Sequence, residues 1–88
     1  MRTTYKKKFL KDLNSVPEPV KEKIQEIVFE KIPCTDNVQQ INGIKKMKGY
    51  SDYYRIRFSE YRIGISVKED RVVFLRVLHR KDIYKYFP

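Results

Sequence analysis

The chain has 88 residues, the size of one small domain, and 41% of them are hydrophobic. Its 20 Lys and Arg outnumber 11 Asp and Glu, so the formal net charge is +9. This composition excludes a wholly disordered basic tail, because it is apolar enough to build a core. No apolar stretch approaches the roughly 20 residues of a membrane span, and Met1 to Lys8 lead into no apolar signal segment. We therefore expect one cytoplasmic domain over residues 1–88, with no membrane partner.

The N-terminal half predicts a short strand and two helices. Arg2–Tyr5 are typical of a short edge strand. The apolar stripe of the first helix consists of Phe9, Leu10, Leu13 and Val16. The charged residues between them, Asp12 included, are expected to face water. Ser15 and Glu18 fit a capping box at the start of the second helix, which Pro33 ends. The buried face of that helix is expected to carry Val20, Ile24, Ile27, Val28 and Ile32.

The C-terminal half predicts a sheet. Residues 33–50 are interpreted as a long connection with several turn signals. From residue 53 the period of the apolar residues changes from about 3.6 to 2, which indicates three antiparallel strands in a meander. The fold class is therefore α+β, with an N-terminal helical hairpin packed on one face of a small antiparallel sheet and a short helical tail at the C-terminus. We expect the other face of the sheet to be open.

The positive charge is concentrated in the second half of the chain. Residues 1–44 hold 8 Lys and Arg against 6 Asp and Glu, whereas residues 45–88 hold 12 against 5. The net charges are therefore +2 and +7. A basic face on a small domain favours a polyanionic partner, usually nucleic acid.

A tight turn at Ser59-Glu60 would place Arg57 opposite Arg62, with Arg55 on the same face. Like charges directly opposite each other destabilise a sheet, and a bound polyanion would relieve that repulsion. Arginine also makes forked contacts with phosphate. The open face is therefore interpreted as a phosphate-binding surface.

The last strand has two possible registers. A three-residue turn at 68–70 would place Arg76 opposite Arg62 and would send Val73, Leu75 and Val77 to the core. A two-residue turn would instead bury Arg76. We favour the first register because it leaves no charge in the core. Arg80 would then lie at the end of this strand on the same face.

The tail from His79 to Pro88 mixes bases with aromatic residues. This mixture suits stacking on unpaired nucleotide bases beside phosphate contacts. The spacing also permits a short helix packed on the sheet, with Ile83 and Phe87 inward and Tyr84 toward the basic face. The one cysteine, Cys34, cannot form an internal disulfide, and with the one histidine it cannot make a zinc site. We expect no cofactor, no metal and an inert Cys34.

The runs Tyr54–Phe58 (YRIRF), Tyr61–Ile63 (YRI) and Val77–Tyr84 (VLHRKDIY) resemble the RelE/ParE toxin superfamily. Lys46–Gly49 (KMKG) resembles the KLKG element that precedes these runs in the family. The resemblance covers essentially the whole chain. It implies a RelE-like β-α-α-β-β-β fold and a toxin of a type II toxin–antitoxin system, either a monomer or a hetero-oligomer with a RelB-like cognate antitoxin.

The RelE branch of this superfamily implies a ribosome-dependent endoribonuclease (an mRNA interferase) that inhibits translation. Such a toxin enters the A site of the 30S subunit, between mRNA and rRNA, and cuts the mRNA without a metal. The ribose 2′-hydroxyl attacks the adjacent phosphate, which leaves a 2′,3′-cyclic phosphate and a 5′-hydroxyl.

The residues that the resemblance places at catalytic positions are Arg55, Arg57, Arg62, Arg80 and Tyr84. Arg62 matches the arginine that neutralises the phosphorane, Arg80 the one that helps to protonate the leaving 5′-oxygen, and Tyr84 the tyrosine that stacks on a base. Arginine stays protonated and cannot be a general base, so that role stays open between Tyr84, His79 and another residue. Tyr86 could take the place of Tyr84 if the tail is shifted by half a helical turn. The further residues expected to bind RNA are Lys45, Lys46, Lys48, Arg76, His79, Lys81 and Tyr86.

Two other functions fit the same fold. The first is a ParE-like inhibitor of DNA gyrase, which acts by protein contact and has no nuclease activity. The second is a non-toxic antitoxin partner or RNA-binding module.

Overall fold

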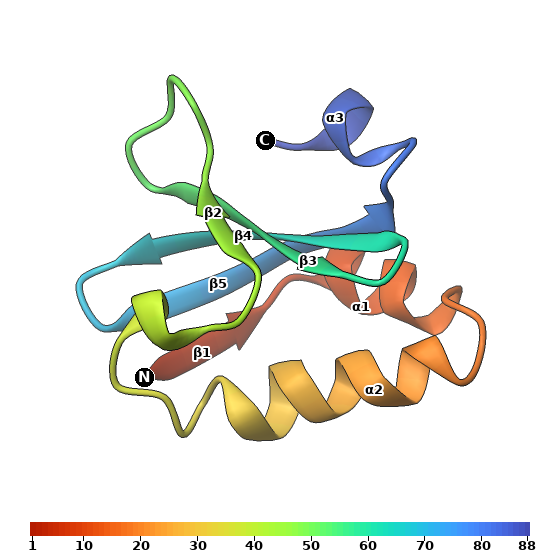
Figure 1. Cartoon of the computed structure of the whole chain (residues 1–88), viewed down its shortest axis with the longest axis horizontal. Coiled ribbons are helices and arrows are strands. Elements are labelled where there is room, and N and C mark those ends of the chain that lie inside the picture. The colour runs from red at the N-terminus through yellow and green to blue at the C-terminus, as the bar shows by residue number, and fades with distance from the viewer.

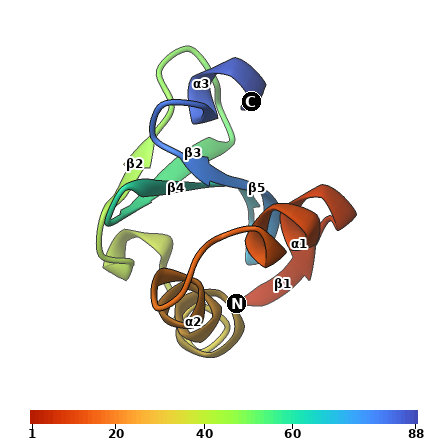
Figure 2. The same cartoon turned by 90° about the vertical axis from the view of Figure 1, so that its right-hand side faces the viewer.

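The protein, described here by a computed structural model of residues Met1–Pro88, is a five-stranded sheet with helices on both faces (Figures 1 and 2). In chain order the elements are β1 (Arg2–Tyr5), α1 (Lys7–Asn14), α2 (Val20–Glu26), the π-helical turn η1 (Ile27–Lys31), the 3₁₀ turn η2 (Val38–Gln40), β2 (Ile44–Lys46), β3 (Tyr53–Phe58), β4 (Tyr61–Lys68), β5 (Arg71–His79) and α3 (Ile83–Tyr86). None of these helices combines the length and the apolar character that crossing a bilayer requires. The expected α+β class is confirmed.

The strand order is β1-β5-β4-β3-β2, with β1 parallel to β5 and every other pair antiparallel. The meander β3–β4–β5 and the edge strand β1 were predicted. The strand β2 was not, because the prediction treated residues 33–50 as a connection. The strand has only three residues, too few to show an alternation of apolar and polar side chains. It nevertheless pairs with β3, where Ile44 lies opposite Ile56, and adds one strand to the sheet.

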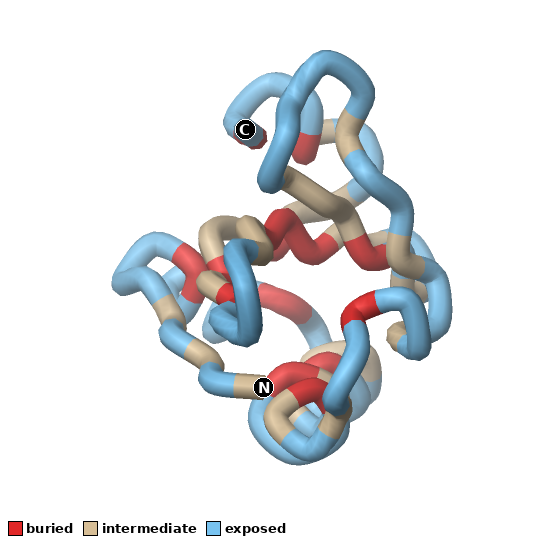
Figure 3. Tube along the Cα trace, turned by 90° about the vertical axis from the view of Figure 1, so that its left-hand side faces the viewer, coloured by how far each residue is buried: buried red, intermediate tan, exposed pale blue.

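The core lies between the sheet and the layer of α1 and α2 (Figure 3). The second helical segment contributes Ile24, Val28 and Ile32 to the core, as predicted, whereas its Val20 and Ile27 are only partly buried. Leu10 was expected in the core but is 43% exposed. The reason is geometric, because Phe9 and Leu13 define the buried stripe of this short helix and Leu10 is turned about 100° from Phe9.

The predicted capping box does not form. The helix begins at Val20, directly after Pro19, with no side-chain cap. Two closely spaced prolines keep the preceding residues out of the helical conformation, so Ser15 lies too far upstream. The carboxylate of Glu18 instead accepts a hydrogen bond from the Glu22 N–H at 3.3 Å. The helical stretch ends just before Pro33, as expected.

The register of β5 differs from both predicted alternatives. Lys68 pairs with Arg71 across a two-residue turn, and a bulge then shifts the pairing between Gly64 and Ile65. Arg76 therefore lies opposite Gly64, not opposite Arg62, and Leu75 is the unpaired extra residue. The buried residues of this strand are Val72, Phe74 and Val77. The prediction that Val73 and Leu75 enter the core was wrong, because the turn has two residues rather than three. The bulge then returns Val77 to the core side and keeps Arg76 out of it.

The second face of the sheet is only partly open. The short helix α3 stands over it, on the same side of the sheet as the loop that joins β2 to β3 (Figure 1). Ile83 and Phe87 are buried against this face, as expected of the tail. The Phe87 ring fits because position 64 is a glycine, where a Cβ would come within 2.6 Å of the ring.

Candidate active site

Three arginines meet on the open face of the β3–β4 hairpin. Arg57 lies directly opposite Arg62, as the sequence predicted, and Arg55 lies opposite Gly64 on the same face. The tight turn between the strands holds Ser59 at a φ of 54°. Burial, followed by the nearby positive charges of Arg55 and Arg57, lowers the pKa of Arg62. Like charges therefore crowd together at the loop end of this hairpin.

The turn also orients Arg62. One guanidinium nitrogen, Nη1, donates hydrogen bonds to the carbonyl oxygens of Ser59 at 3.0 Å and Tyr61 at 2.9 Å. Nε and Nη2 make no hydrogen bond within the protein. The side chain is thus held at one end and keeps N–H donors available for an anion.

Arg80 joins this group from the end of β5. Its backbone N–H donates to the Glu60 carbonyl at 2.8 Å, which ties the residue to the β3–β4 turn. Its Nε lies 3.5 Å from the Glu60 carboxylate, and both side chains are more than half exposed. An ion pair this exposed is weak and can be exchanged for a phosphate contact. The positive charge of Arg80 also contributes to lowering the pKa of Arg62.

Tyr84 borders the cluster from α3. The guanidinium carbon of Arg55 lies 5.7 Å from the centre of its ring, within cation–π range. The residue is 58% exposed, whereas Ile83 and Phe87 on the same helix are buried. The predicted orientation of the tail is therefore confirmed. We call Arg55, Arg57, Arg62, Arg80 and Tyr84 the arginine–tyrosine cluster.

The remaining basic positions are spread around this cluster. Lys45 lies opposite Arg55 and so shares its face of the sheet. Lys46 lies opposite Tyr54, on the face of the sheet that α1 and α2 cover. Lys48 is exposed in the loop that follows β2.

His79 lies on the other face of the sheet from Arg62. It lies opposite Tyr61, on the same face of the sheet as the buried pair Ile63 and Val77. Its ring meets the Tyr61 ring edge-on at 5.6 Å, and its Nδ1 accepts a hydrogen bond from the Lys81 N–H at 3.1 Å. The structure therefore does not bring His79 into the arginine–tyrosine cluster.

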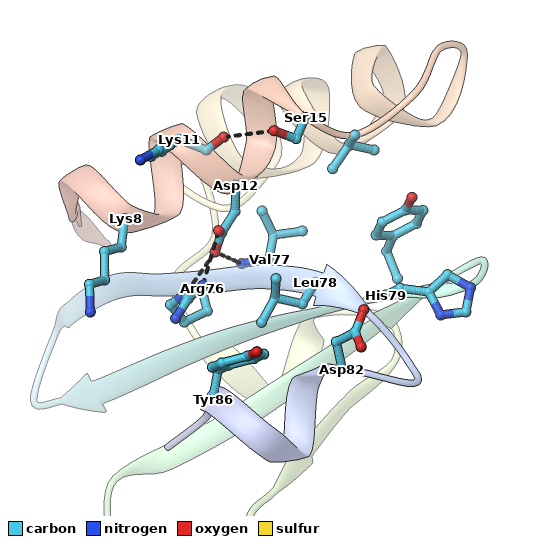
Figure 4. A pocket seen from close by; sticks show the side chains of 12 residues that line it. Lys8, Lys11, Asp12, Ser15, Arg76, Val77, Leu78, His79, Asp82 and Tyr86 are labelled. Atoms are coloured by element: carbon cyan, nitrogen blue, oxygen red, sulfur yellow. Dashed lines mark hydrogen bonds and ion pairs between the residues drawn. The ribbon is translucent and has the colours of Figure 1, made fainter.

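Arg76 is engaged by a partner that the sequence did not reveal (Figure 4). Its Nε and Nη2 donate to the Asp12 carboxylate of α1 at 2.7 and 3.1 Å. The Asp12 side chain, expected to face water, is only 13% exposed. The hydrogen bond to Asp12 raises the pKa of Arg76. The two residues are 64 positions apart, and no spacing rule connects them.

Tyr86 faces the same ion pair. The guanidinium carbon of Arg76 lies 5.5 Å from the centre of the Tyr86 ring. Asp12, Arg76 and Tyr86 line a groove between α1 and α3 (Figure 4). No three His, Cys, Asp or Glu side chains anywhere in the chain lie close enough together to hold a metal ion. Cys34 is exposed and forms no disulfide.

The chain belongs to the family of ParE and RelE toxins of type II toxin–antitoxin systems. The family model described as "ParE toxin of type II toxin-antitoxin system, parDE" matches residues 4–84. The chain is similar to Toxin RelE3 of Methanocaldococcus jannaschii, with 45% identity over 89 residues that cover 100% of both proteins. The resemblance seen in the sequence motifs is thereby confirmed.

Solved structures agree with this assignment. The fold matches a chain of the RelB–RelE antitoxin–toxin complex from Methanococcus jannaschii with a TM-score of 0.82 at 46% identity, covering 97% of this chain and 99% of that one. It also matches a chain of the RelBE2 complex from Mycobacterium tuberculosis with a TM-score of 0.70 at 20% identity, covering 90% and 96%. The second match supports the fold alone.

Proposed function

We propose that this toxin is a ribosome-dependent endoribonuclease that cuts mRNA in the A site and so stops translation. The observation that carries the proposal is the arginine–tyrosine cluster, in which two guanidinium groups of β3, one of β4 and one just after β5 gather near one exposed tyrosine. This arrangement suits a phosphodiester better than an uncharged substrate. Action on ribosomes would place the protein in the cytoplasm.

The proposed reaction is an internal transesterification. The 2′-oxygen of one nucleotide bonds to the adjacent phosphorus as its proton passes to a base, and the bond from phosphorus to the 5′-oxygen breaks as that oxygen takes up a proton. The products are a 2′,3′-cyclic phosphate and a 5′-hydroxyl. Negative charge builds up on the phosphorane between these steps. Each well-placed guanidinium contributes on the order of 2–4 kcal/mol to stabilising it.

We assign the roles by position. Arg62, held by the turn, would face the phosphorane with its two unbonded nitrogens. Arg80, whose exposed ion pair with Glu60 is readily exchanged, would stabilise and help to protonate the leaving 5′-oxygen. Arg55 and Arg57 would bind the flanking phosphates.

The general base is proposed to be Tyr84. An arginine cannot accept the proton, because its guanidinium stays charged. His79, the other candidate, lies on the opposite face of the sheet, beside Tyr61. The ring of Tyr84 would also stack on a nucleotide base.

The bordering residues would bind RNA. Lys45 extends the positive surface along β2. Lys48 is exposed in the loop that follows β2, and Lys81 in the turn that follows β5. Tyr86 offers a second exposed ring on α3. Lys46 and His79 would contribute at the rim, for contacts with rRNA rather than with the scissile phosphate.

We further propose a RelB-like antitoxin as the partner of this toxin. The similar toxin from Methanococcus jannaschii was solved in complex with its RelB antitoxin. An antitoxin segment with acidic and apolar residues would neutralise the arginine–tyrosine cluster or displace α3, because α3 is a short terminal element. The free toxin would be a monomer and the inhibited form a hetero-oligomer.

Inhibition of DNA gyrase is the second candidate function. The observation that favours it is the family model itself, whose description names the ParE toxins. In that case the basic face would be a protein-binding surface, and the four guanidinium groups would have no catalytic role.

One experiment separates the two functions. The purified chain is tested in three separate reactions. They contain ribosomes that carry a defined A-site codon, the same mRNA alone, or gyrase with relaxed plasmid DNA. Cleavage only on ribosomes, with a 2′,3′-cyclic phosphate end, is the expected result. Cleavage of the naked mRNA as well would keep the nuclease and remove the ribosome dependence. No cleavage together with inhibited supercoiling would establish the alternative.

A further inference from the structure

The structure points to Asp12, Arg76 and Tyr86 as a clamp that positions α3, and with it Tyr84, over the arginine–tyrosine cluster. We call these three residues the α1–α3 clamp. The inference rests on the proposed nuclease function. It assigns Arg76 a positioning role in place of the RNA contact expected from the sequence.

The position of α3 depends on side-chain contacts. It has only four residues, too few to be stable as an isolated helix. Ile83 and Phe87 anchor it by burial. Two stacked contacts then set its angle on the sheet: Arg55 lies against the Tyr84 ring and Arg76 against the Tyr86 ring.

Arg76 is the more rigid of these two supports. Its fork is bound by both oxygens of Asp12, and its side chain is 19% exposed. A forked ion pair with little solvent access has one favoured geometry. Arg55, by contrast, has no carboxylate partner and belongs to the repelling cluster.

Asp12 is held in place by the edge of the sheet. The pairing of β1 with β5 ends at Tyr5 opposite Phe74, so the strand edge beyond Phe74 has no neighbouring strand. The Asp12 carboxylate fills this gap and accepts a hydrogen bond from the Val77 N–H at 3.2 Å. One carboxylate therefore links α1, the end of β5 and, through Arg76, the helix that carries Tyr84.

The same contacts leave Arg76 poorly placed to bind phosphate. Two of its three nitrogens already donate to Asp12. A phosphate would have to displace a carboxylate that is itself largely buried, which leaves a charge without its partner.

Two substitutions test the clamp. Asp12→Asn keeps an oxygen for the Val77 N–H but removes the charge that holds Arg76. Arg76→Lys keeps the positive charge but loses the fork and the flat face that packs on Tyr86. The matched control is Asp70→Asn, which breaks the exposed pair of Asp70 with Arg2 at the far end of β5 and changes the net charge as Asp12→Asn does.

The expected result is a loss of kcat of about tenfold in each clamp variant with KM changed by less than about twofold, because misaimed catalytic groups slow the chemical step. The double variant should be no slower than either single one, since the two residues act as a unit. Asp70→Asn should behave as the wild type. The clamp is wrong if Asp12→Asn cleaves as fast as or faster than the wild type while Arg76→Lys raises KM, the pattern of a direct RNA contact.

Amide exchange tests the clamp without any need for activity. The Phe87 N–H donates to the Ile83 carbonyl at 2.8 Å and reports whether α3 is formed. Its exchange should be faster by about fivefold in both clamp variants, the effect of losing one cation–π contact, and unchanged in Asp70→Asn. Unchanged exchange in the clamp variants would overturn the inference. If the wild type cleaves no RNA, the nuclease proposal fails, and the exchange data still decide whether these residues position α3.

Discussion

The ring and the hydroxyl of Tyr84 have different roles in the proposed reaction, and two substitutions separate them. Tyr84→Phe keeps the ring beside Arg55 and removes the group that would accept the 2′-proton. We expect kcat to fall by about 100-fold, the usual size of a lost general base, with KM unchanged. Tyr84→Leu should also raise KM, because it cannot stack on a base. Single-turnover cleavage at several toxin concentrations gives both constants. A Tyr84→Phe variant with the wild-type rate would place the base elsewhere.

Arg62 is predicted to act through its shape as well as its charge. A lysine at this position keeps the charge but cannot hydrogen-bond two turn carbonyls while it presents further N–H donors to a phosphate. We expect Arg62→Lys to lower the cleavage rate at least about tenfold. The loss approaches that caused by removing a hydrogen-bond donor that stabilises the transition state. Arg71→Lys, an exposed position at the start of β5, serves as the control. Equal rates for the two variants would show that a point charge is sufficient.

The docking of α3 on the sheet is tested at Gly64. An added Cβ would lie within 2.6 Å of the Phe87 ring, so Gly64→Ala should push the helix off its site. We expect a loss of about 1–3 kcal/mol in the free energy of unfolding, the usual cost of overpacking, together with reduced cleavage. Denaturant unfolding measures the first effect. The double variant Gly64→Ala/Phe87→Leu should recover part of both losses, and no recovery would separate Gly64 from α3.

Alternation identified the hairpin but not the whole sheet. Tyr54, Ile56 and Phe58 alternate with polar residues, and this pattern identified the strand. A two-residue turn then fixed the register and placed Arg57 opposite Arg62. The last strand is a continuous apolar run from Val72 to Leu75, and such a run has no parity to read. The bulge at Leu75 shifts the pairing between Gly64 and Ile65, and no residue of the run marks this point. Its position was therefore beyond the reach of a local pattern.

The candidate site, like the sheet, could be predicted only in the part that local sequence determines. The arginines of β3 and β4 could be predicted, because they lie close together in sequence and one turn determines their register. The ion pair of Asp12 with Arg76 could not, because it forms only where β1 ends and leaves the edge of β5 uncovered. The position of His79 away from Arg62 likewise depends on the bulge.

The whole molecule places like charges together, and this should cost stability. Arg57 and Arg62 face each other, and neighbouring arginines contribute to lowering the pKa of Arg62. Removing one charge by Arg57→Gln should raise Tm by about 2–4 °C, from roughly 0.5 kcal/mol of relieved repulsion. The same variant should cleave more slowly. Thermal unfolding at low salt tests this trade of stability for function, and a lower Tm in the variant would contradict it.

If the arginine–tyrosine cluster is a catalytic centre for RNA, as proposed, Arg80→Ala should abolish most of the cleavage. The measurement is the single-turnover rate of mRNA cleavage on programmed ribosomes, with Arg71→Ala as the control that removes an equal charge at the start of β5. We expect a fall of about 100-fold or more for Arg80→Ala and the wild-type rate for Arg71→Ala, with both proteins folded. Undiminished cleavage by Arg80→Ala would contradict the assignment, and the cluster would then be a binding surface only.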